Sequence, residues 1–278
     1  MLTAALVGGV LIPSLAMAQD SDDSAPDHTH PDWSSPASRW DVTVGGGVGV
    51  RPTYEGSDRY AVTPVPYIDV TYDDWLSLGP GGLSAYWHDG NLRIGGGLTR
   101  NGGRKDSDGN GIFNEGDARL KGLGNIGSAV GFKAFASYKL GLVKVSGTVT
   151  KFNGSTSSNG SPTNDGVLVG IDAAMPFHLT DKLMIMTKVG ATWANQNYMQ
   201  TFFGVTAMQA ANSRFSPYTA NAGLKNVDVG IGASYRFNPR WSIHVLLDVK
   251  ELTGDAAKSP ITFSKTDASF MTTINYHF

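Results

Sequence analysis

The chain has 278 residues, a formal net charge of −2 and only 17% charged side chains, so its composition gives no indication of a nucleic-acid partner. It contains no cysteine, which excludes stabilisation by disulfides. Beyond residue 18 no apolar stretch of about 18 residues occurs, which excludes a helical membrane protein. The 35 glycines and abundant aromatic residues suit a β-barrel whose strands are half apolar.

The first 18 residues are predicted to be a signal peptide. An apolar run from Leu2 to Leu15 precedes Ala16-Met17-Ala18, a small-x-small cleavage site, so we expect the mature chain to start at Gln19. The run lacks a preceding Lys or Arg. A membrane-spanning helix is the alternative, but about 14 apolar residues are fewer than the roughly 20 that a span needs.

Residues 19–38 form the next segment, rich in Asp, Ser and Pro, which has too few apolar side chains to fold alone. We interpret it as a disordered periplasmic linker. Its His28 and His30 could hold Zn²⁺ or Cu²⁺ loosely, but the plain linker is the favoured interpretation.

From Trp40 onward, apolar and polar residues alternate with the period of a β-strand. Val227, Val229 and Ile231, for example, share one face, and Asp228 lies on the other. The pattern predicts an all-β protein over residues 39–278, a transmembrane antiparallel up-and-down barrel of about 12 strands. We place the strands near residues 40–50, 63–73, 75–79, 82–88, 91–100, 126–138, 141–151, 166–177, 182–193, 226–237, 240–250 and 266–278.

The connections alternate in length, which predicts the orientation of the barrel. Longer segments at 51–62, 101–125, 152–165, 194–225 and 251–265 separate short turns, and in outer-membrane barrels the short turns face the periplasm. Both termini are then periplasmic. Reading residues 75–88 as one bulged strand is the alternative, and it would give eleven strands and break this parity.

Aromatic residues near the strand ends predict two interfacial girdles. They are Trp40, Trp75, Trp87, Phe177, Trp193, Phe237, Trp241 and Phe278. The last strand places Phe270, Ile274, Tyr276 and Phe278 on one face. Its closing Tyr276-x-Phe278 is of the type that the barrel-assembly machinery of Gram-negative outer membranes is thought to recognise, so we expect it to be an assembly signal.

A series of short motifs resembles the MipA/OmpV family of outer-membrane proteins, also called MltA-interacting proteins, over nearly the whole mature chain. The order and spacing of the motifs make the resemblance specific. They are Pro52-x-Tyr54-Glu55-Gly56-Ser57-Asp58, Pro64-x-Pro66-Tyr67-Ile68, Gly103-Arg104, Leu120-Lys121-Gly122-Leu123-Gly124-Asn125-Ile126-Gly127, Phe202-Phe203-Gly204-Val205, Tyr218-x-Ala220-x-Ala222-Gly223-Leu224, Leu252-x-Gly254-Asp255-Ala256-x-x-Ser259-Pro260-Ile261 and Tyr276-x-Phe278.

The resemblance implies a location and a role. Family members are outer-membrane barrels, and the namesake is described as a scaffold that joins a lytic murein transglycosylase to a penicillin-binding protein in peptidoglycan synthesis. We therefore expect a monomeric, non-enzymatic envelope scaffold in the lipid of the outer membrane. The alternative is a narrow channel for small-solute entry. The predicted lumen carries both signs of charge and does not decide between an open and a plugged barrel; its charged residues are Lys144, Lys188, Arg236, Lys250, Asp172, Asp228 and Asp248.

Most motif residues fall in the predicted external loops. Arg104, Asp58 and Asp255 could pair across the mouth of the barrel and fold the loops inward as a lid. Turn chemistry that serves only loop folding and strand registration is the equal alternative.

Residues Asp106 to Asp117 match the spacing of a calcium-binding loop. Side-chain or carbonyl oxygens of Asp106, Asp108, Asn110, Ile112 and Asp117 would be the ligands. The closing Asp is shorter than the usual Glu and no flanking helix is predicted, so a plain polar loop is the favoured alternative.

No catalytic residue or cofactor is predicted. His244 and Asp248 share an inner face but lie about 13 Å apart along a strand, whereas a base and its orienting group need a separation of roughly 3 Å. His277 lies on the closing strand, and the chain has no nucleophile-elbow or zinc-protease motif.

Overall fold

The computed structural model describes residues 39–108, 116–154 and 163–278. The predicted signal peptide, its cleavage site after Ala18, and the linker with His28 and His30 lie outside the described residues. Among the described residues, no helix is long and apolar enough to cross a membrane.

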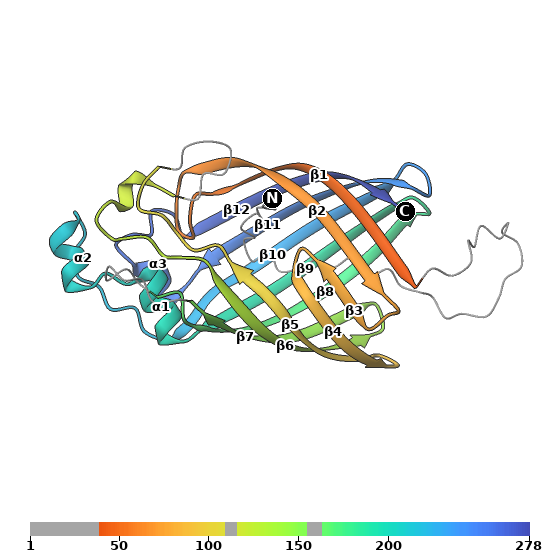
Figure 1. Ribbon diagram of the computed structural model, residues 1–278, viewed down its shortest axis with the longest axis horizontal. Helices are drawn as coiled ribbons and strands as arrows, with labels where there is room; N and C mark the ends of the chain where they lie inside the picture. Colours follow the sequence, from red (N-terminus) through yellow and green to blue (C-terminus); the bar gives the residue numbers. More distant parts are fainter. Residues whose placement is uncertain (1–38, 109–115, 155–162) are drawn as a thin grey trace, which may run out of the picture.

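Twelve antiparallel strands form a closed barrel in which each strand pairs with its neighbours in sequence and β1 pairs with β12 (Figure 1). The fold prediction is confirmed, and every predicted strand lies within three residues of an observed one. The strands are β1 (Trp40–Pro52), β2 (Tyr60–Tyr72), β3 (Leu76–Gly79), β4 (Gly82–Asp89), β5 (Leu92–Asn101), β6 (Ala129–Leu140), β7 (Val143–Asn153), β8 (Val167–Thr180), β9 (Leu183–Ala194), β10 (Gly223–Arg236), β11 (Trp241–Leu252) and β12 (Thr266–His277).

Alternation along each strand separates a lipid-facing surface from the lumen. On β12, Thr273 and Asn275 are 1% and 0% exposed, whereas Ile274 between them is 52% exposed. Exposing apolar side chains to water is unfavourable. The row of exposed apolar side chains around the closed barrel is therefore the surface that lipid covers. Aromatic rings gather near the termini, where the Tyr276 ring lies 5.1 Å from that of Trp241 and 4.9 Å from that of Phe278.

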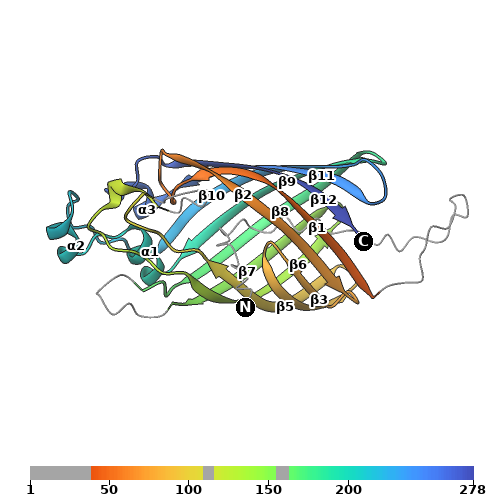
Figure 2. The same cartoon turned by 45° about the horizontal axis from the view of Figure 1, so that its top comes forward.

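Short turns lie at the end of the barrel where β1 begins and β12 ends, which we call the turn end. Between β2 and β3, Asp73 and Asp74 have positive φ values of 47° and 53°, as in a type I′ turn, and Trp75 N donates to Tyr72 O at 3.3 Å. Long connections gather at the opposite end, which we call the loop end (Figure 2). The predicted alternation of short and long connections is therefore confirmed.

The hairpin β3–β4 is too short to reach the loop end, so the wall of the barrel is interrupted there. β2 pairs with β1 along its whole length but with β3 only over Val70–Tyr72. No described strand pairs with residues 60–69 on that side. Pro64 and Pro66 lie in this stretch, and proline is tolerated on a strand edge because it has no N–H to leave unpaired. This gives a physical reason for the Pro-x-Pro motif.

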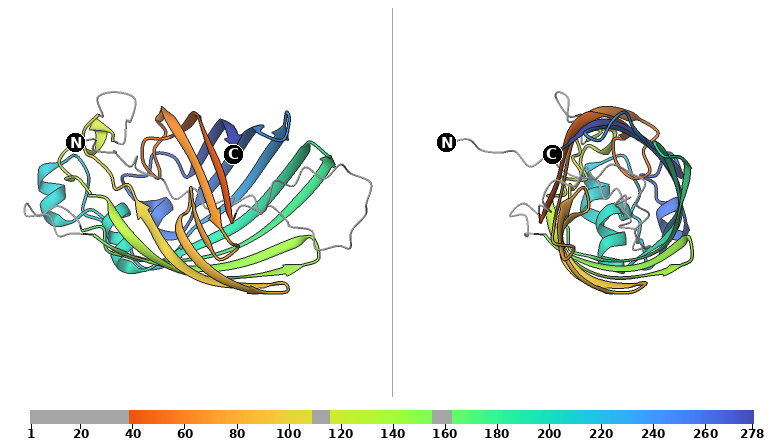
Figure 3. Two further views of the ribbon diagram at one scale, coloured as in Figure 1. Left: turned by 45° about the vertical axis from the view of Figure 1, so that its right-hand side comes forward. Right: turned by 90° about the vertical axis from the view of Figure 1, so that its right-hand side faces the viewer.

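Three short helices in the loops complete the fold. They are α1 (Gln196–Phe203), α2 (Ala207–Asn212) and α3 (Gly254–Lys258), and a 3-10 turn, η1 (Ala118–Leu120), lies in the β5–β6 connection. Viewed along the barrel axis, helices of the loop end lie within the outline of the barrel (Figure 3).

Candidate functional site

The connections at the loop end pack on one another and close that end. We call the described parts of residues 53–59, 102–128, 195–222 and 253–265 the lid. Its residues supply most of two clusters of buried side chains. The first joins α1 to the barrel wall through Phe152, Leu168, Met199, Phe203, Leu252 and Ala256. The second joins four loops through Tyr54, Leu120, Leu123, Val205, Phe215 and Ile261.

Hydrogen bonds to main-chain carbonyls fix the loops of the lid to one another. The Tyr54 hydroxyl donates to Ile261 O at 2.9 Å, and the Ser259 hydroxyl donates to Phe203 O at 2.6 Å. The Tyr218 hydroxyl donates to Asp255 O at 2.9 Å. The Phe203 carbonyl lies at the carboxyl end of α1, where it has no partner within the helix, and the Ile261 carbonyl lies in the loop after α3. These bonds therefore satisfy main-chain groups that the packed loops would otherwise leave without a partner.

Arg104 lies inside the lid and is only 3% exposed. Its Nη1 donates to Phe202 O at 2.8 Å, near the carboxyl end of α1, where a positive charge is favourable. Its Nε and Nη2 are buried and have no hydrogen-bond partner among the described residues. Burial lowers the pKa of the Arg104 guanidinium to about 10.

A separate ion network holds the β1–β2 loop to the β5–β6 loop. Arg119 contacts Asp58 at 2.5 Å and Asp117 at 2.7 Å, and Arg59 lies 3.3 Å from Asp117. Asp117 also caps η1 by accepting from Arg119 N. Burial alone would raise the pKa of Asp117, but its bonds from Arg119 hold that pKa below the usual value.

The predicted pairing of Arg104 with Asp58 and Asp255 is wrong. Arg104 points to the end of α1, Asp58 pairs with Arg119, and Asp255 accepts from both the main chain and the side chain of Asn221. The reason is the folding of α1 and α3 within the lid, which places main-chain carbonyls and amides where the pattern suggested opposite charges. The loops nevertheless fold inward as the lid hypothesis states.

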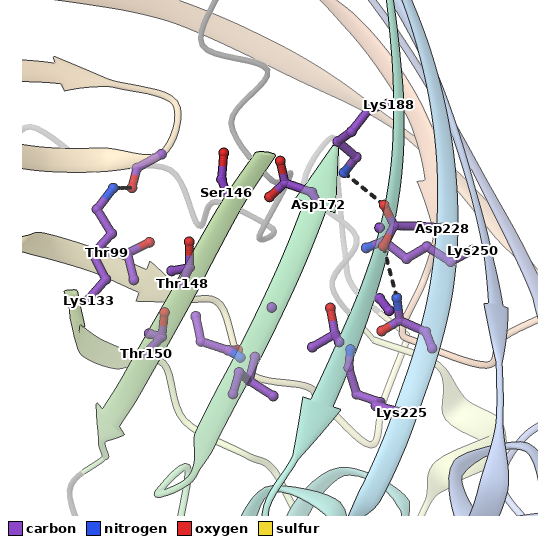
Figure 4. Close-up of a pocket in the computed structure, with 18 of the residues that line it drawn as sticks. Thr99, Lys133, Ser146, Thr148, Thr150, Asp172, Lys188, Lys225, Asp228 and Lys250 are labelled. Carbon is purple, nitrogen blue, oxygen red and sulfur yellow. Dashed lines mark hydrogen bonds and ion pairs between the residues drawn. The ribbon is translucent and has the colours of Figure 1, made fainter. Parts of the chain in front are cut away.

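Beneath the lid lies a cavity of about 410 Å³ in the lumen (Figure 4). Tyr198 and Phe202 of α1 line it from the lid. Every strand except β2 contributes residues that line the cavity, and no described residue of β2 does so. The volume is that of a small-molecule site.

One side of the cavity carries compensated charges. Lys188 Nζ lies 2.8 Å from Asp228 Oδ2 and 3.8 Å from Asp248 Oδ2. Lys225 Nζ lies 2.5 Å from Glu55 Oε1, and the Tyr198 hydroxyl donates to Glu55 Oε2 at 3.4 Å. Burial opposes ionisation of Glu55, but the ammonium groups of Lys225 and Lys250 outweigh it and lower the Glu55 pKa.

The predicted lumen residues lie largely where we expected them. Lys144, Lys188, Lys250, Asp172 and Asp228 line the cavity. Asp248 pairs with Lys188. Arg236 lies instead at the end of β10 nearest the termini, where it is exposed.

Sequence reasoning missed Lys225 and Glu55 as lumen residues. A β-bulge between Leu224 and Asn226 turns both Lys225 and Asn226 inward, which breaks the alternation that would have placed Lys225 toward lipid. Glu55 lies in the motif Pro52-x-Tyr54-Glu55, but the motif does not show that its side chain points into the lumen, where it contacts Lys225.

A model of the family described as MltA-interacting protein MipA matches residues 44–278. The chain belongs to the MipA family. No curated protein matches the chain.

Solved structures that resemble this MipA-family chain are outer-membrane proteins. An outer-membrane channel from Pseudomonas putida F1 is 13% identical with a TM-score of 0.44, and the match covers 92% of this chain and 100% of the channel. OmpT of Vibrio cholerae is 10% identical with a TM-score of 0.39, covering 88% of this chain and 99% of that protein. These scores are too low to carry an argument. The outer-membrane assignment therefore follows from the family match together with the closed barrel and its apolar exterior.

Most residues of the family-like motifs lie in or beside the lid, although Pro64 and Pro66 lie in β2 and Tyr276 lies near the end of β12. Pro52, Gly56 and Ser57 lie at the β1–β2 connection, where Gly56 N donates to Asp267 Oδ2 at 3.0 Å. Gly103 and Gly122 have positive φ values of 80° and 93°, and an added Cβ would meet a carbonyl oxygen at 2.1 Å and 1.9 Å. Val205 and Tyr218 exchange main-chain hydrogen bonds. The motif residues Leu123, Gly204, Gly223, Gly254 and Pro260 lie in or beside the same loops.

The calcium loop stays a prediction, because Asn110 and Ile112 lie outside the described residues. The side chains of the three acidic candidates have protein partners. Asp106 accepts from Gly122 N and Gly124 N, Asp108 accepts from Ala118 N, and Asp117 pairs with Arg119. In the described residues, no group of three or more acidic or histidine side chains is arranged to hold a metal ion.

The two lumen histidines lie apart from the charged side of the cavity. His244 is 3.4 Å from the Ser242 hydroxyl and packs edge-on against Tyr67. His277 contacts Asp41 at 3.3 Å and Thr43 at 3.4 Å. Neither histidine lines the cavity beneath the lid.

Proposed function

We propose that this MipA-family barrel is a non-enzymatic scaffold of the outer membrane, monomeric and with both termini in the periplasm, that joins a murein hydrolase to a murein synthase. The closed lid carries the proposal, because a barrel whose loop end is packed with apolar side chains is better suited to holding partners than to free diffusion of solutes. The family is named for an interaction with MltA, not for a reaction.

The partner surface in this proposal is the turn end of the barrel, where β1 begins and β12 ends. Tight turns there expose polar and charged side chains, including Asp73, Asp74, Asn238 and Arg240. Asn238 Oδ1 accepts from Arg240 N and Trp241 N, so this turn has a fixed shape that a partner could recognise. The linker of residues 19–38 would extend the reach of the same face.

The test is co-purification of the mature chain, residues 19–278, in detergent with an MltA-type lytic transglycosylase and a penicillin-binding protein of the same host. We expect both enzymes to be retained, and replacement of residues 238–240 by Gly-Ser-Gly to weaken retention of at least one. Met208→Ser, at an exposed position of α2 in the lid, is the matched control and should retain both. Retention of neither enzyme by the folded wild-type barrel would refute the scaffold.

A narrow channel is the second candidate, and the cavity of about 410 Å³ within the lumen is the observation that favours it. Planar-bilayer recordings of the refolded mature chain test it. Stable conductance steps would support passage of small solutes. A silent barrel that migrates as folded protein would exclude the channel.

A further inference from the structure

The cavity beneath the lid has two chemically different sides. Strands β9–β12 and the β1–β2 loop supply the side in which Lys188 and Lys225 have acidic partners. Strands β3–β7 supply the opposite side, which we call the basic wall. Its charged lining residues are Arg93, Lys133 and Lys144, and none of the described residues of β3–β7 that line the cavity is acidic. Asp172, on the adjoining β8, interacts electrostatically with Lys144.

Hydroxyl groups surround these basic side chains. On β7, Ser146, Thr148 and Thr150 follow Lys144 at every second position, so their side chains share one face at intervals of about 7 Å. Neighbouring strands add further hydroxyls. Those of the basic wall that line the cavity include Ser84, Thr99, Ser137, Ser146, Thr148 and Thr150.

Lys133, on β6, lies beside Thr99 of β5 (Figure 4). Its Nζ donates to Gly81 O at 2.8 Å and lies 5.9 Å from the centre of the Phe135 ring. An ammonium group has three donors and is costly to remove from water without an opposite charge. A carbonyl and the face of an aromatic ring do not supply that charge, so Lys133 would gain from an anion in the cavity.

The lining of the whole cavity also has more basic than acidic side chains. Among the described residues, eight basic residues line it, namely Arg51, Arg93, Arg104, Lys133, Lys144, Lys188, Lys225 and Lys250, against four acidic residues, Glu55, Asp172, Asp228 and Asp267. Asp248 adds one more carboxylate through Lys188. The cavity therefore carries an excess of positive charge in formal terms, and its volume suits a molecule of sugar size.

We propose that this cavity binds an anionic sugar, with the carboxylate or phosphate held by Lys133 and the sugar hydroxyls bonded to the Ser and Thr side chains of β5 and β7. The acid group supplies Lys133 with an opposite charge, which Gly81 O and the Phe135 ring do not. The row of hydroxyls provides both donors and acceptors. A polyhydroxylated ring uses both, whereas a fully ionised inorganic anion uses only the donors. This site is independent of the scaffold proposal.

Isothermal titration calorimetry of the folded mature barrel with D-glucuronate tests the proposal, with glucose 6-phosphate as a second anionic probe and glucose as the neutral control. We expect a Kd below about 1 mM for the two anions and at least about tenfold weaker binding of glucose. Lys133→Met should weaken glucuronate binding about tenfold or more. Lys182→Met, in a turn outside the cavity, should leave it unchanged.

Thr148→Val separates sugar recognition from charge alone, because it removes one hydroxyl and retains all the cations. It should weaken glucuronate binding and leave acetate binding unchanged. The anionic sugar could also belong to a glycolipid, so a parallel titration uses lipopolysaccharide. Binding of lipopolysaccharide but not free glucuronate, with weakening by Lys133→Met, supports the site and identifies a lipid source. Absence of binding by all anionic probes, equal binding of glucose and glucuronate, or unchanged binding in folded Lys133→Met would overturn the proposal.

Discussion

Arg104 donates a hydrogen bond from Nη1 to the carbonyl of Phe202 at 2.8 Å, which ties the β5–β6 loop to the end of α1, 98 positions later in the chain. The bond crosses the interior of the lid, and the guanidinium is almost fully buried. It therefore couples two long connections that share no strand pairing.

Arg104→Ala should loosen the lid without unfolding the barrel. Loss of a hydrogen bond from a charged group to a buried carbonyl costs about 2 kcal/mol, which raises the open, protease-accessible population about thirtyfold. Limited proteolysis followed by mass spectrometry would measure the cleavage rate within residues 195–222. Arg240→Ala, in a turn at the other end, is the control and should leave this rate unchanged. Equal cleavage rates in Arg104→Ala and wild type would show that the lid does not depend on this bond.

The pH dependence of the lid should follow the Glu55–Lys225 pair. The Glu55 pKa is held below its ordinary value of 4.5, so the folded lid binds the proton less tightly than the open chain does. Stabilisation is therefore complete above pH 4.5 and is lost as the pH falls through the lowered pKa. Proteolysis of wild type by an acid-active protease should accelerate over that interval.

Glu55→Gln should remove part of this acid sensitivity, because an amide does not titrate. The variant should be cleaved faster than wild type at neutral pH and show a flatter rise on acidification. Glu251→Gln, at the end of β11, serves as the matched carboxylate control. A rise in Glu55→Gln as steep as that of wild type would assign the acid sensitivity to other groups, such as Asp117.

The barrel could be predicted from the sequence because its pattern is local. Whether a residue faces lipid or lumen is decided by the parity of its position, so Thr273, Ile274 and Asn275 reveal their faces without knowledge of their neighbours. Even the β3–β4 hairpin follows from its glycines, since Gly82 has a φ of 93°. One bulge at Lys225 reverses that parity, so the sequence pattern does not predict that this cation faces the lumen.

The lid could not be predicted in the same way. Helices of eight, six and five residues are too short to be stable alone. The cluster around Met199 buries side chains of α1 and α3, whereas α2 has no buried residue and only its Ala210 packs against the cluster around Val205. The chain does contain start signals, since Asn195 caps α1 and Thr206 forms a capping box with Gln209. The partners of buried loop side chains, such as Phe202 O for Arg104, depend on how the loops pack on one another, and this packing leaves no periodic pattern in the sequence.

Lys188→Met should destabilise the barrel. The three side chains of Lys188, Asp228 and Asp248 are 5%, 6% and 8% exposed, so removal of the cation leaves two buried carboxylates without their closest counter-charge. Breaking a buried pair costs about 3–5 kcal/mol. Because Lys250 faces Asp228 across the β10–β11 pairing, we expect the lower end of that range.

Urea unfolding of the barrel in lipid vesicles, followed by its shift in gel mobility, would measure the change. The double variant Lys188→Met with Asp228→Asn should recover part of the lost stability, since it also removes one unpaired charge. Lys182→Met is the surface control. An unchanged midpoint in Lys188→Met would show that the lumen is wet enough to solvate the carboxylates.

Phe278→Ala should reduce delivery of the barrel to the outer membrane more than it reduces stability. The Phe278 side chain is 75% exposed, so its removal deletes little packing, and the main-chain bond from Phe278 N to Val42 O is retained. If the assembly machinery reads the closing aromatic, the amount of folded protein in cell membranes should fall several-fold. Refolding of the same variant into synthetic vesicles should match wild type. Phe237→Ala, an exposed aromatic near the same end, controls for loss of a girdle residue. Equal losses in both variants, or a failure of Phe278→Ala to refold in vesicles, would assign Phe278 to the girdle or to folding and not to an assembly signal.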